Sequence, residues 1–300
     1  MASAGAAVLG GCRMLETPAR RFDDNLSVFV SDIHVLPDSY QRDRFAKVVD
    51  EILAMDPLPR NVVCFGDVAW VYGTRADYET SRPLLKRLVD AGISLTLGMG
   101  NHDHRRNFLD AWPEYADRTL VPGRITTRVN LGHCDLILLD TLWEDHLDET
   151  RMCKVSGEID GTQFDWLKAE IANLTRPTFV AAHHPADEME KGDGAAFIDL
   201  MMSSPAVVGY LHGHKHVWSP KLMRRTGCKW GDSRFKRVLG LPSTGHWGDI
   251  GHVVFRTFPG AARADLVEND HFFPNPDAKT WIDEEMIRER QGLSCTFRWT

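Results

Sequence analysis

Signatures of several common protein classes are missing from this 300-residue chain. Its six cysteines include no Cys-x-x-Cys pair, which excludes a zinc ribbon and a thioredoxin-type redox motif. The absence of a Gly-x-Gly-x-x-Gly or Walker loop argues against a nucleotide-binding α/β domain. There is no run of lysine and arginine and the formal net charge is -7, so a nucleic-acid polymer is not an expected partner. No apolar stretch is long enough to span a membrane.

The composition is that of a soluble globular protein, with 43% hydrophobic and 26% charged residues. Its beginning differs, because residues 1–12 are small, apolar and uncharged, and Val8-Leu9-Gly10-Gly11-Cys12 resembles the lipid-attachment box of a bacterial lipoprotein. No positively charged segment precedes this box. We expect residues 1–22 to be a truncated export signal with a lipid anchor at Cys12, or else a disordered tail. The first interpretation makes the protein periplasmic or lipid-anchored, and the second makes it cytoplasmic.

Strands and helices alternate in the first hundred residues. Apolar runs at 26–30, 62–65 and 93–97 predict buried strands, and helices are predicted between them at 41–55 and 78–90. The first helix carries one apolar stripe, formed by Phe45, Val48, Val49, Ile52 and Leu53. This alternation indicates right-handed βαβ units and a largely parallel sheet.

The second half of the chain repeats this pattern less regularly. Strands are predicted at 134–139, 178–182 and 206–211, with a helix at 161–173. Short antiparallel strands are predicted at 237–239, 253–255 and 264–267, followed by a solvated helix near 283–290. Because no linker or repeat interrupts the sequence, residues 23–300 are expected to form a single α/β domain with two halves of sheet.

Five of the predicted strands are followed by side chains that can bind metal ions. Each cluster alone is ordinary, since a strand-terminal Asp often caps a helix and a lone His is usually structural. All five together are hard to obtain from a chain with 13 histidines. The carboxyl ends of strands are also where open α/β sheets place their ligands. The candidate residues are Asp32, His34, Asp67, Asn101, His102, His183, His214 and His216.

This mixture of imidazole and carboxylate groups indicates which metals would bind. Such ligands suit zinc, iron or manganese, whereas an all-oxygen set would suit magnesium or calcium. A carboxylate such as Asp67 can bridge two ions through its two oxygens. Two ions about 3.5–4 Å apart can hold one hydroxide between them and stabilise an in-line displacement. We therefore expect two divalent or trivalent ions, Mn, Fe or Zn.

Over residues 26–216 the chain resembles the calcineurin-like metallophosphoesterase superfamily, and within it the small bacterial phosphodiesterase branch. The resemblance implies an α/β fold, an αββα sandwich of two mixed β-sheets flanked by helices, with a dinuclear metal site at strand ends. The family motifs D-x-H, G-D, G-N-H-D, H and G-H-x-H are matched in order by Asp32-Ile33-His34, Gly66-Asp67, Gly100-Asn101-His102-Asp103, His183 and Gly213-His214-Lys215-His216.

The same resemblance implies a role for each residue. His102 would not bind metal but would face the substrate and protonate the leaving oxygen, and Asp103 would orient its ring. His183 is preferred to His184 as a ligand because it comes first after the strand. Metal one would take Asp32, His34, Asp67 and His216, and metal two would take Asp67, Asn101, His183 and His214.

The chain departs from the purple acid phosphatases at Trp70, which stands where their G-D-x-x-Y motif has a tyrosine. An indole cannot bind ferric iron, so no purple colour is expected. Among flanking residues, His104 and Arg105, with Arg106 and Lys215, could clamp a further phosphate charge or could simply be solvated. In the last third, His246 and Trp247 are candidates for contact with substrate.

Together with the donor set, the resemblance implies a metal-dependent phosphoric-ester hydrolase acting on a small phosphate ester. We expect a phosphodiesterase in which a metal-bridging hydroxide attacks phosphorus and His102 assists departure of the alcohol. One alternative is a phosphomonoesterase acting on small metabolites. Another is a metal-binding scaffold without turnover, although such scaffolds usually lose ligands.

Overall fold

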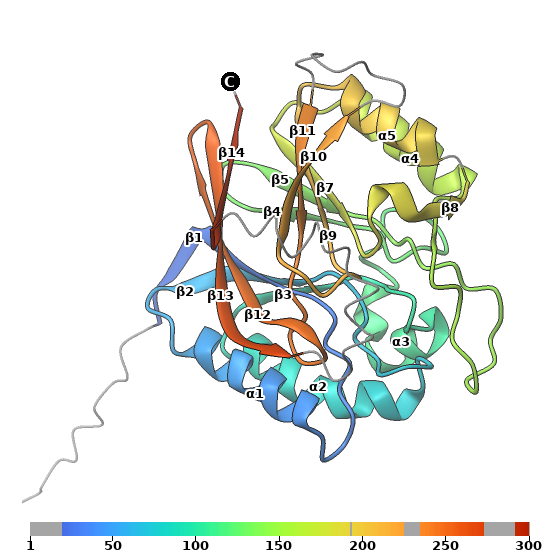
Figure 1. The fold of residues 1–300 in the computed structure, drawn as a ribbon, viewed down its shortest axis with the longest axis vertical. Coiled ribbons are helices and arrows are strands. Elements are labelled where there is room, and N and C mark those ends of the chain that lie inside the picture. Colours follow the sequence, from blue (N-terminus) through green and yellow to red (C-terminus); the bar gives the residue numbers. More distant parts are fainter. Residues whose placement is uncertain (1–19, 193, 225–234, 273–291, 300) are drawn as a thin grey trace, which may run out of the picture.

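Two six-stranded sheets lie face to face, with helices on their outer faces, in the computed structural model (Figure 1). The structure describes residues 20–192, 194–224, 235–272 and 292–299. The expected αββα sandwich of two mixed sheets is confirmed. Residues 1–19 and the helix expected near 283–290 lie outside the described residues, so the export signal and the anchor at Cys12 stay predictions.

In the first sheet, three parallel strands adjoin three antiparallel ones. β1, β2 and β3 are parallel, and β12, β13 and β14 continue the sheet by antiparallel pairing from β1. The strand order is β14 (Ser294–Arg298), β13 (Ala261–Phe272), β12 (Gly248–Phe258), β1 (Phe22–Val30), β2 (Leu58–Cys64) and β3 (Ser94–Leu97).

The second sheet has a parallel centre and antiparallel edges. Its order is β10 (Ser219–Arg224), β11 (Phe235–Gly240), β9 (Val207–His212), β7 (Thr178–Ala182), β5 (Asp135–Leu138) and β4 (Thr127–Asn130). The strand predicted at 237–239 was expected to be antiparallel to its neighbours. It corresponds to β11, which is antiparallel to β10 but parallel to β9, so the expectation is wrong for the pairing with β9. A separate pair consists of β6 (Gly157–Glu158) and β8 (Met189–Lys191).

Side-chain caps mark the beginnings of the two helices that cover the first sheet. Ser39 accepts a hydrogen bond from the Arg42 backbone at the start of α1, and Thr74 forms a capping box with Asp77 at the start of α2. No helix in the described ranges is long and apolar enough to cross a membrane. The helices are α1 (Tyr40–Leu53), α2 (Arg75–Asp90), α3 (Arg105–Ala111), α4 (Gly161–Ala172) and α5 (Gly194–Ser203), with short 3₁₀ turns η1 (Pro113–Tyr115) and η2 (Ala186–Glu188).

The core has three layers because successive strand residues face opposite sides of a sheet. In β1, Val28 packs toward α1 and α2, whereas Phe29 packs between the sheets. Phe255 of the first sheet meets Phe179 of the second, with ring centroids 5.3 Å apart. Among the described residues, Cys64, Cys134, Cys153 and Cys295 are buried and form no disulfide. This packing holds the carboxyl ends of both parallel groups at fixed positions.

Candidate functional site

The predicted ligands gather where the strands of both sheets end. Asp32 and His34 follow β1, Asp67 follows β2 and Asn101 follows β3, all from the first sheet. The second sheet contributes residues after β7 and β9. His214 is partly buried, and the other ligands are buried: Asp32, His34, Asp67, Asn101, His183 and His216.

The backbone at these strand ends adopts an uncommon conformation. Six non-glycine residues in the described ranges have a positive φ, and all but Asp38 are predicted ligands. A non-glycine residue in this left-handed region costs about 1–3 kcal/mol, and such strain clusters at functional sites. The five ligands are Asp32 (φ 53°), His34 (46°), Asp67 (52°), His214 (68°) and His216 (56°). Their conformation turns the chain out of the pleat so that these side chains converge.

Gly100 is required for this convergence. A Cβ atom at this position would overlap the Asp67 carboxylate and would lie 2.6 Å from the Asp67 backbone nitrogen. Only glycine therefore lets the loop after β3 approach the loop after β2. The glycine of the G-N-H-D motif brings Asn101 and His102 next to Asp67.

One group of donor atoms contains Asp32, His34, Asp67 and His216. Asp32 Oδ1 lies 3.1 Å from His216 Nε2 and 3.8 Å from His34 Nε2. His34 Nε2 in turn lies 3.4 Å from Asp67 Oδ2. His34 Nε2 is buried and makes no hydrogen bond within the described structure. A buried nitrogen facing two carboxylates in this way fits a metal ion between them.

A second group contains Asp67, Asn101, His183 and His214. Asn101 Oδ1 lies 3.1 Å from His183 Nε2 and 2.9 Å from His214 Nδ1. Asp67 Oδ2, which also faces His34, lies 3.2 Å from His183 Nε2. One carboxylate oxygen thus belongs to both groups, and the two sets are those that the resemblance implied.

Backbone carbonyls determine which ring nitrogen each histidine offers. His34 Nδ1 lies 2.8 Å from the Trp70 carbonyl, and His183 Nδ1 lies 3.1 Å from the Phe65 carbonyl. A carbonyl can only accept, so Nδ1 carries a proton in both rings and Nε2 is the nitrogen that faces the site. His214 is oriented by Glu188, whose Oε2 lies 3.4 Å from Nε2, and its Nδ1 faces the second group. Glu188 belongs to no motif, and sequence reasoning missed it.

Charge at the centre favours cations. Burial raises the pKa of Asp32 and Asp67, but His216 beside Asp32 and His183 beside Asp67 outweigh burial and hold the pKa of both carboxyls below its ordinary value. Two ionised and almost inaccessible carboxylates need positive charge nearby. The combination of imidazole, carboxylate and amide donors therefore fits a pair of metal ions.

His102 lies at the same centre, but Asp103 does not orient it. His102 Nδ1 lies 3.0 Å from the Val71 carbonyl, so the expectation that Asp103 holds this ring is wrong. The Asp103 carboxylate is buried and instead accepts hydrogen bonds from the backbones of Ala69 (3.0 Å) and Gly100 (2.9 Å). Asp103 thus fixes the loops after β2 and β3 and has no contact with the reacting atoms.

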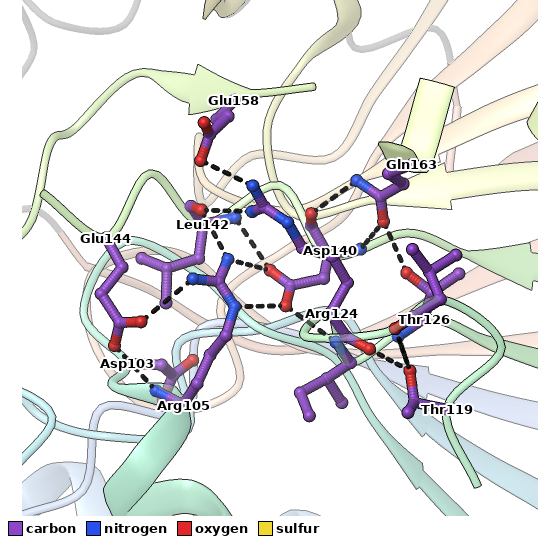
Figure 2. A network of polar contacts seen from close by, with 12 residues as sticks. Asp103, Arg105, Thr119, Arg124, Thr126, Asp140, Leu142, Glu144, Glu158 and Gln163 are labelled. Atoms are coloured by element: carbon purple, nitrogen blue, oxygen red, sulfur yellow. Dashed lines mark hydrogen bonds and ion pairs between the residues drawn. The ribbon is translucent and has the colours of Figure 1, made fainter. Parts of the chain in front are cut away.

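The expectation that His104 and Arg105 contact substrate is also wrong. The Arg105 guanidinium is 14% exposed and forms a bidentate pair with Asp140, at 2.7 and 2.8 Å (Figure 2). It also donates to Glu144 at 3.1 Å. His104 is buried, and its Nδ1 lies 3.0 Å from Glu144 Oε1. Both cationic side chains are paired with carboxylates of the protein, so neither is available to bind a phosphate.

His246 and Trp247 lie beside the first group. The His246 ring centroid is 4.7 Å from that of His34, and the Trp247 ring is 4.2 Å from that of His216. Ser243 ties their loop to the ligand loop by donating to the Asp32 carbonyl at 2.9 Å and accepting from the His246 backbone. Their contact with substrate stays a prediction.

His183 and His184 differ in what their nitrogens face. His183 Nε2 points to Asp67 and Asn101, whereas His184 Nδ1 lies 2.8 Å from Thr141 Oγ1. His184 still lies close, because His183, His184 and His214 each offer one donor atom within 4.8 Å of the others.

We expect His183→Ala to lose one metal ion and His184→Ala to retain both. Both side chains are fully buried, so both variants create a cavity and lose stability to a similar extent. Metal content per protein after dialysis, with the melting temperature as the stability control, distinguishes them. Loss of an ion in His184→Ala alone would reverse the assignment.

Comparisons with known proteins agree with this geometry. Residues 27–218 match the family model of calcineurin-like phosphoesterases. A probable cyclic nucleotide phosphodiesterase from Psychrobacter arcticus is 33% identical over 103 residues, which cover 32% of this chain and only about a third (34%) of that protein.

Solved structures show the same fold at low sequence identity. A dimetal phosphatase from Danio rerio has a TM-score of 0.62 at 13% identity, covering 83% of this chain and 97% of that chain. PhoD has a TM-score of 0.53 at 12% identity, covering 89% of this chain and 78% of that chain. With its motifs at the strand ends of this sandwich, the chain belongs to the calcineurin-like phosphoesterase family, a family of dimetal phosphoester hydrolases.

Proposed function

We propose that this chain is a phosphodiesterase with two ions, Mn, Fe or Zn, held by the two groups of residues that share Asp67. The observation that carries the proposal is the position of Asp67 Oδ2, 3.4 Å from His34 Nε2 and 3.2 Å from His183 Nε2. An oxygen between two sets of ligands is suited to bridge two ions. When bound, the ions would activate a water molecule and neutralise phosphate charge.

The residues of the chain have separate tasks in this proposal. His34, His183 and His214 keep a fixed geometry at the centre, because backbone carbonyls and Glu188 set their ring orientations. The His102 ring lies 4.8 Å from that of His34, and its Nδ1 is held by the Val71 carbonyl, which leaves Nε2 as the free ring nitrogen. This nitrogen would deliver a proton to the departing alcohol oxygen. His246 and Trp247 would border the bound ester on the side of the first group.

Charge around the site favours a diester over a monoester. A monoester has an additional negative charge that cationic side chains usually balance. The four cations suggested by the sequence are all paired: His104 with Glu144, Arg105 with Asp140, Arg106 with Glu149 and Lys215 with Glu188. The name of the Psychrobacter arcticus relative also supports a diester, although the match covers a third of that protein.

The test compares bis(4-nitrophenyl) phosphate with 4-nitrophenyl phosphate, using manganese-loaded protein and the same protein after chelation. We expect the loaded protein to hydrolyse the diester with the higher kcat/KM. Chelation should abolish turnover and added manganese should restore it, since the ions supply several kcal/mol of transition-state stabilisation. Preference for the monoester would contradict the diester assignment, and turnover that survives complete chelation would contradict the metal mechanism.

A further inference from the structure

Arg105 connects the two sheets beside the metal centre. It is the first residue of α3, and Phe108 of the same helix packs into the core beneath the first sheet. The Arg105 side chain nevertheless reaches the loop after β5 of the second sheet, as Figure 2 shows. Besides its contacts with Asp140 and Glu144, Nη2 donates to the Leu142 carbonyl at 2.7 Å. The guanidinium thus binds one short loop at three points.

The receiving end of this connection is rigid. Asp140 is fully buried and also accepts hydrogen bonds from the backbones of Ile125 (2.8 Å) and Leu142 (3.1 Å). Gln163 of α4 holds the Asp140 backbone on both sides, donating to its carbonyl at 2.8 Å and accepting from its nitrogen at 3.0 Å. Because the Asp140 carboxylate cannot move independently of the second sheet, it fixes the position of Arg105.

Both ends of the connection lie next to metal ligands. Arg105 comes four residues after Asn101 in the same turn of chain. On the other side, Thr141 follows Asp140 and contacts the His184 ring at 2.8 Å, next to His183. Asn101 Oδ1 and His183 Nε2, which the two sheets supply separately, lie 3.1 Å apart.

We propose that Arg105 is a positioning residue that holds Asn101, through the Asp140 carboxylate, at the correct distance from His183 and His214 for the second metal ion. This role rests on the proposed two-ion site. A planar guanidinium forms two parallel hydrogen bonds to one carboxylate and so fixes angle as well as distance, which an ammonium cannot do. Arg105→Lys therefore keeps the charge but not the geometry.

The test uses Mn²⁺ titration of the full chain, followed by electron paramagnetic resonance, with Arg105→Met and Arg124→Met as a matched pair. Arg124 is a similarly buried cation of the same network, 9% exposed, but it contacts Leu142, Glu158 and Asp160 on the side of the second sheet. We expect Arg105→Met to weaken the second Mn²⁺ by about 10- to 100-fold and to leave the first unchanged. Arg124→Met should bind both ions normally, and Asn101→Ala identifies the second ion.

A second variant separates positioning from stability. Arg105→Lys keeps a positive charge beside Asp140 and Glu144, and it leaves the hydrogen bonds from the Ile125 and Leu142 backbones to Asp140 in place. We expect its melting temperature to stay closer to that of the wild type than that of Arg105→Met, while the second Mn²⁺ is still weakened. Wild-type affinity for the second Mn²⁺ in Arg105→Lys would overturn the positioning role, as would equal weakening in Arg124→Met. Wild-type protein that binds fewer than two Mn²⁺ would overturn the proposed site itself.

Discussion

Asp67→Asn is expected to weaken both metal ions at once and to lower turnover of a phosphodiester by about 10³-fold or more. The amide is almost isosteric with the carboxylate, and its oxygen can still accept the hydrogen bond that the His102 backbone donates to Oδ1 at 2.8 Å. Its NH₂ group, however, would replace the Oδ2 atom that faces His34 and His183. An NH₂ group has no lone pair for a metal, so a single substitution damages both groups of ligands.

Asn101→Ala provides the matched control, because Asn101 faces only His183 and His214. This variant should lose the second ion and keep the first. The metal-to-protein ratio after dialysis, measured by mass spectrometry, distinguishes the two variants, and melting temperatures of the apo proteins show that both are folded. An Asp67→Asn protein that still holds two ions would show that Oδ2 does not bridge them.

The parts of the fold that were predicted from the sequence are those in which local pattern and burial agree. β1, β2 and β7 contain continuous apolar runs, α1 has apolar residues at helical spacing, and the packed layers bury these residues. The helix α5 was not predicted, because its sequence GAAFIDLMMS begins with glycine and has no polar face that marks a period. The edge strand β10 was not predicted either, because its sequence SPKLMR shows no alternation of apolar and polar residues.

The same limit explains which site residues were found. Metal ligands follow strands within short motifs, so their positions in the chain are enough to place them at one edge. Arg105 looked like a loop cation because its carboxylate partners lie 35 and 39 residues further along the chain. Arg105 pairs with carboxylates of the opposite sheet, and sequence spacing does not reveal such contacts. The residue therefore forms a buried connection between the sheets and does not bind phosphate. Glu188 was missed for the same reason, since only the folded chain brings it to His214.

His102→Ala is expected to lower kcat for a phosphodiester by about 10²–10⁴-fold while both metal ions stay bound. Burial lowers the pKa of His102 to about 4, the nearby Asp67 carboxylate opposing this shift, so the ring is neutral near pH 7 before substrate binds. Its Nδ1 proton is held by the Val71 carbonyl, which leaves Nε2 as the site for a transferable proton. A bound phosphate, being negative, favours uptake of that proton and so prepares the ring to act as an acid.

The leaving group tests this role of His102 directly. 4-Nitrophenolate departs without a proton, whereas an alkoxide needs one, so the loss in His102→Ala should be much larger for an alkyl diester than for bis(4-nitrophenyl) phosphate. Metal content must be measured alongside, because donor atoms of His34, Asp67 and His102 lie within 4.8 Å of one another. An ion lost with the ring would make His102 a ligand. Equal losses for both leaving groups, with two ions retained, would instead assign it to stabilising phosphate charge, because only proton transfer depends on the basicity of the departing oxygen.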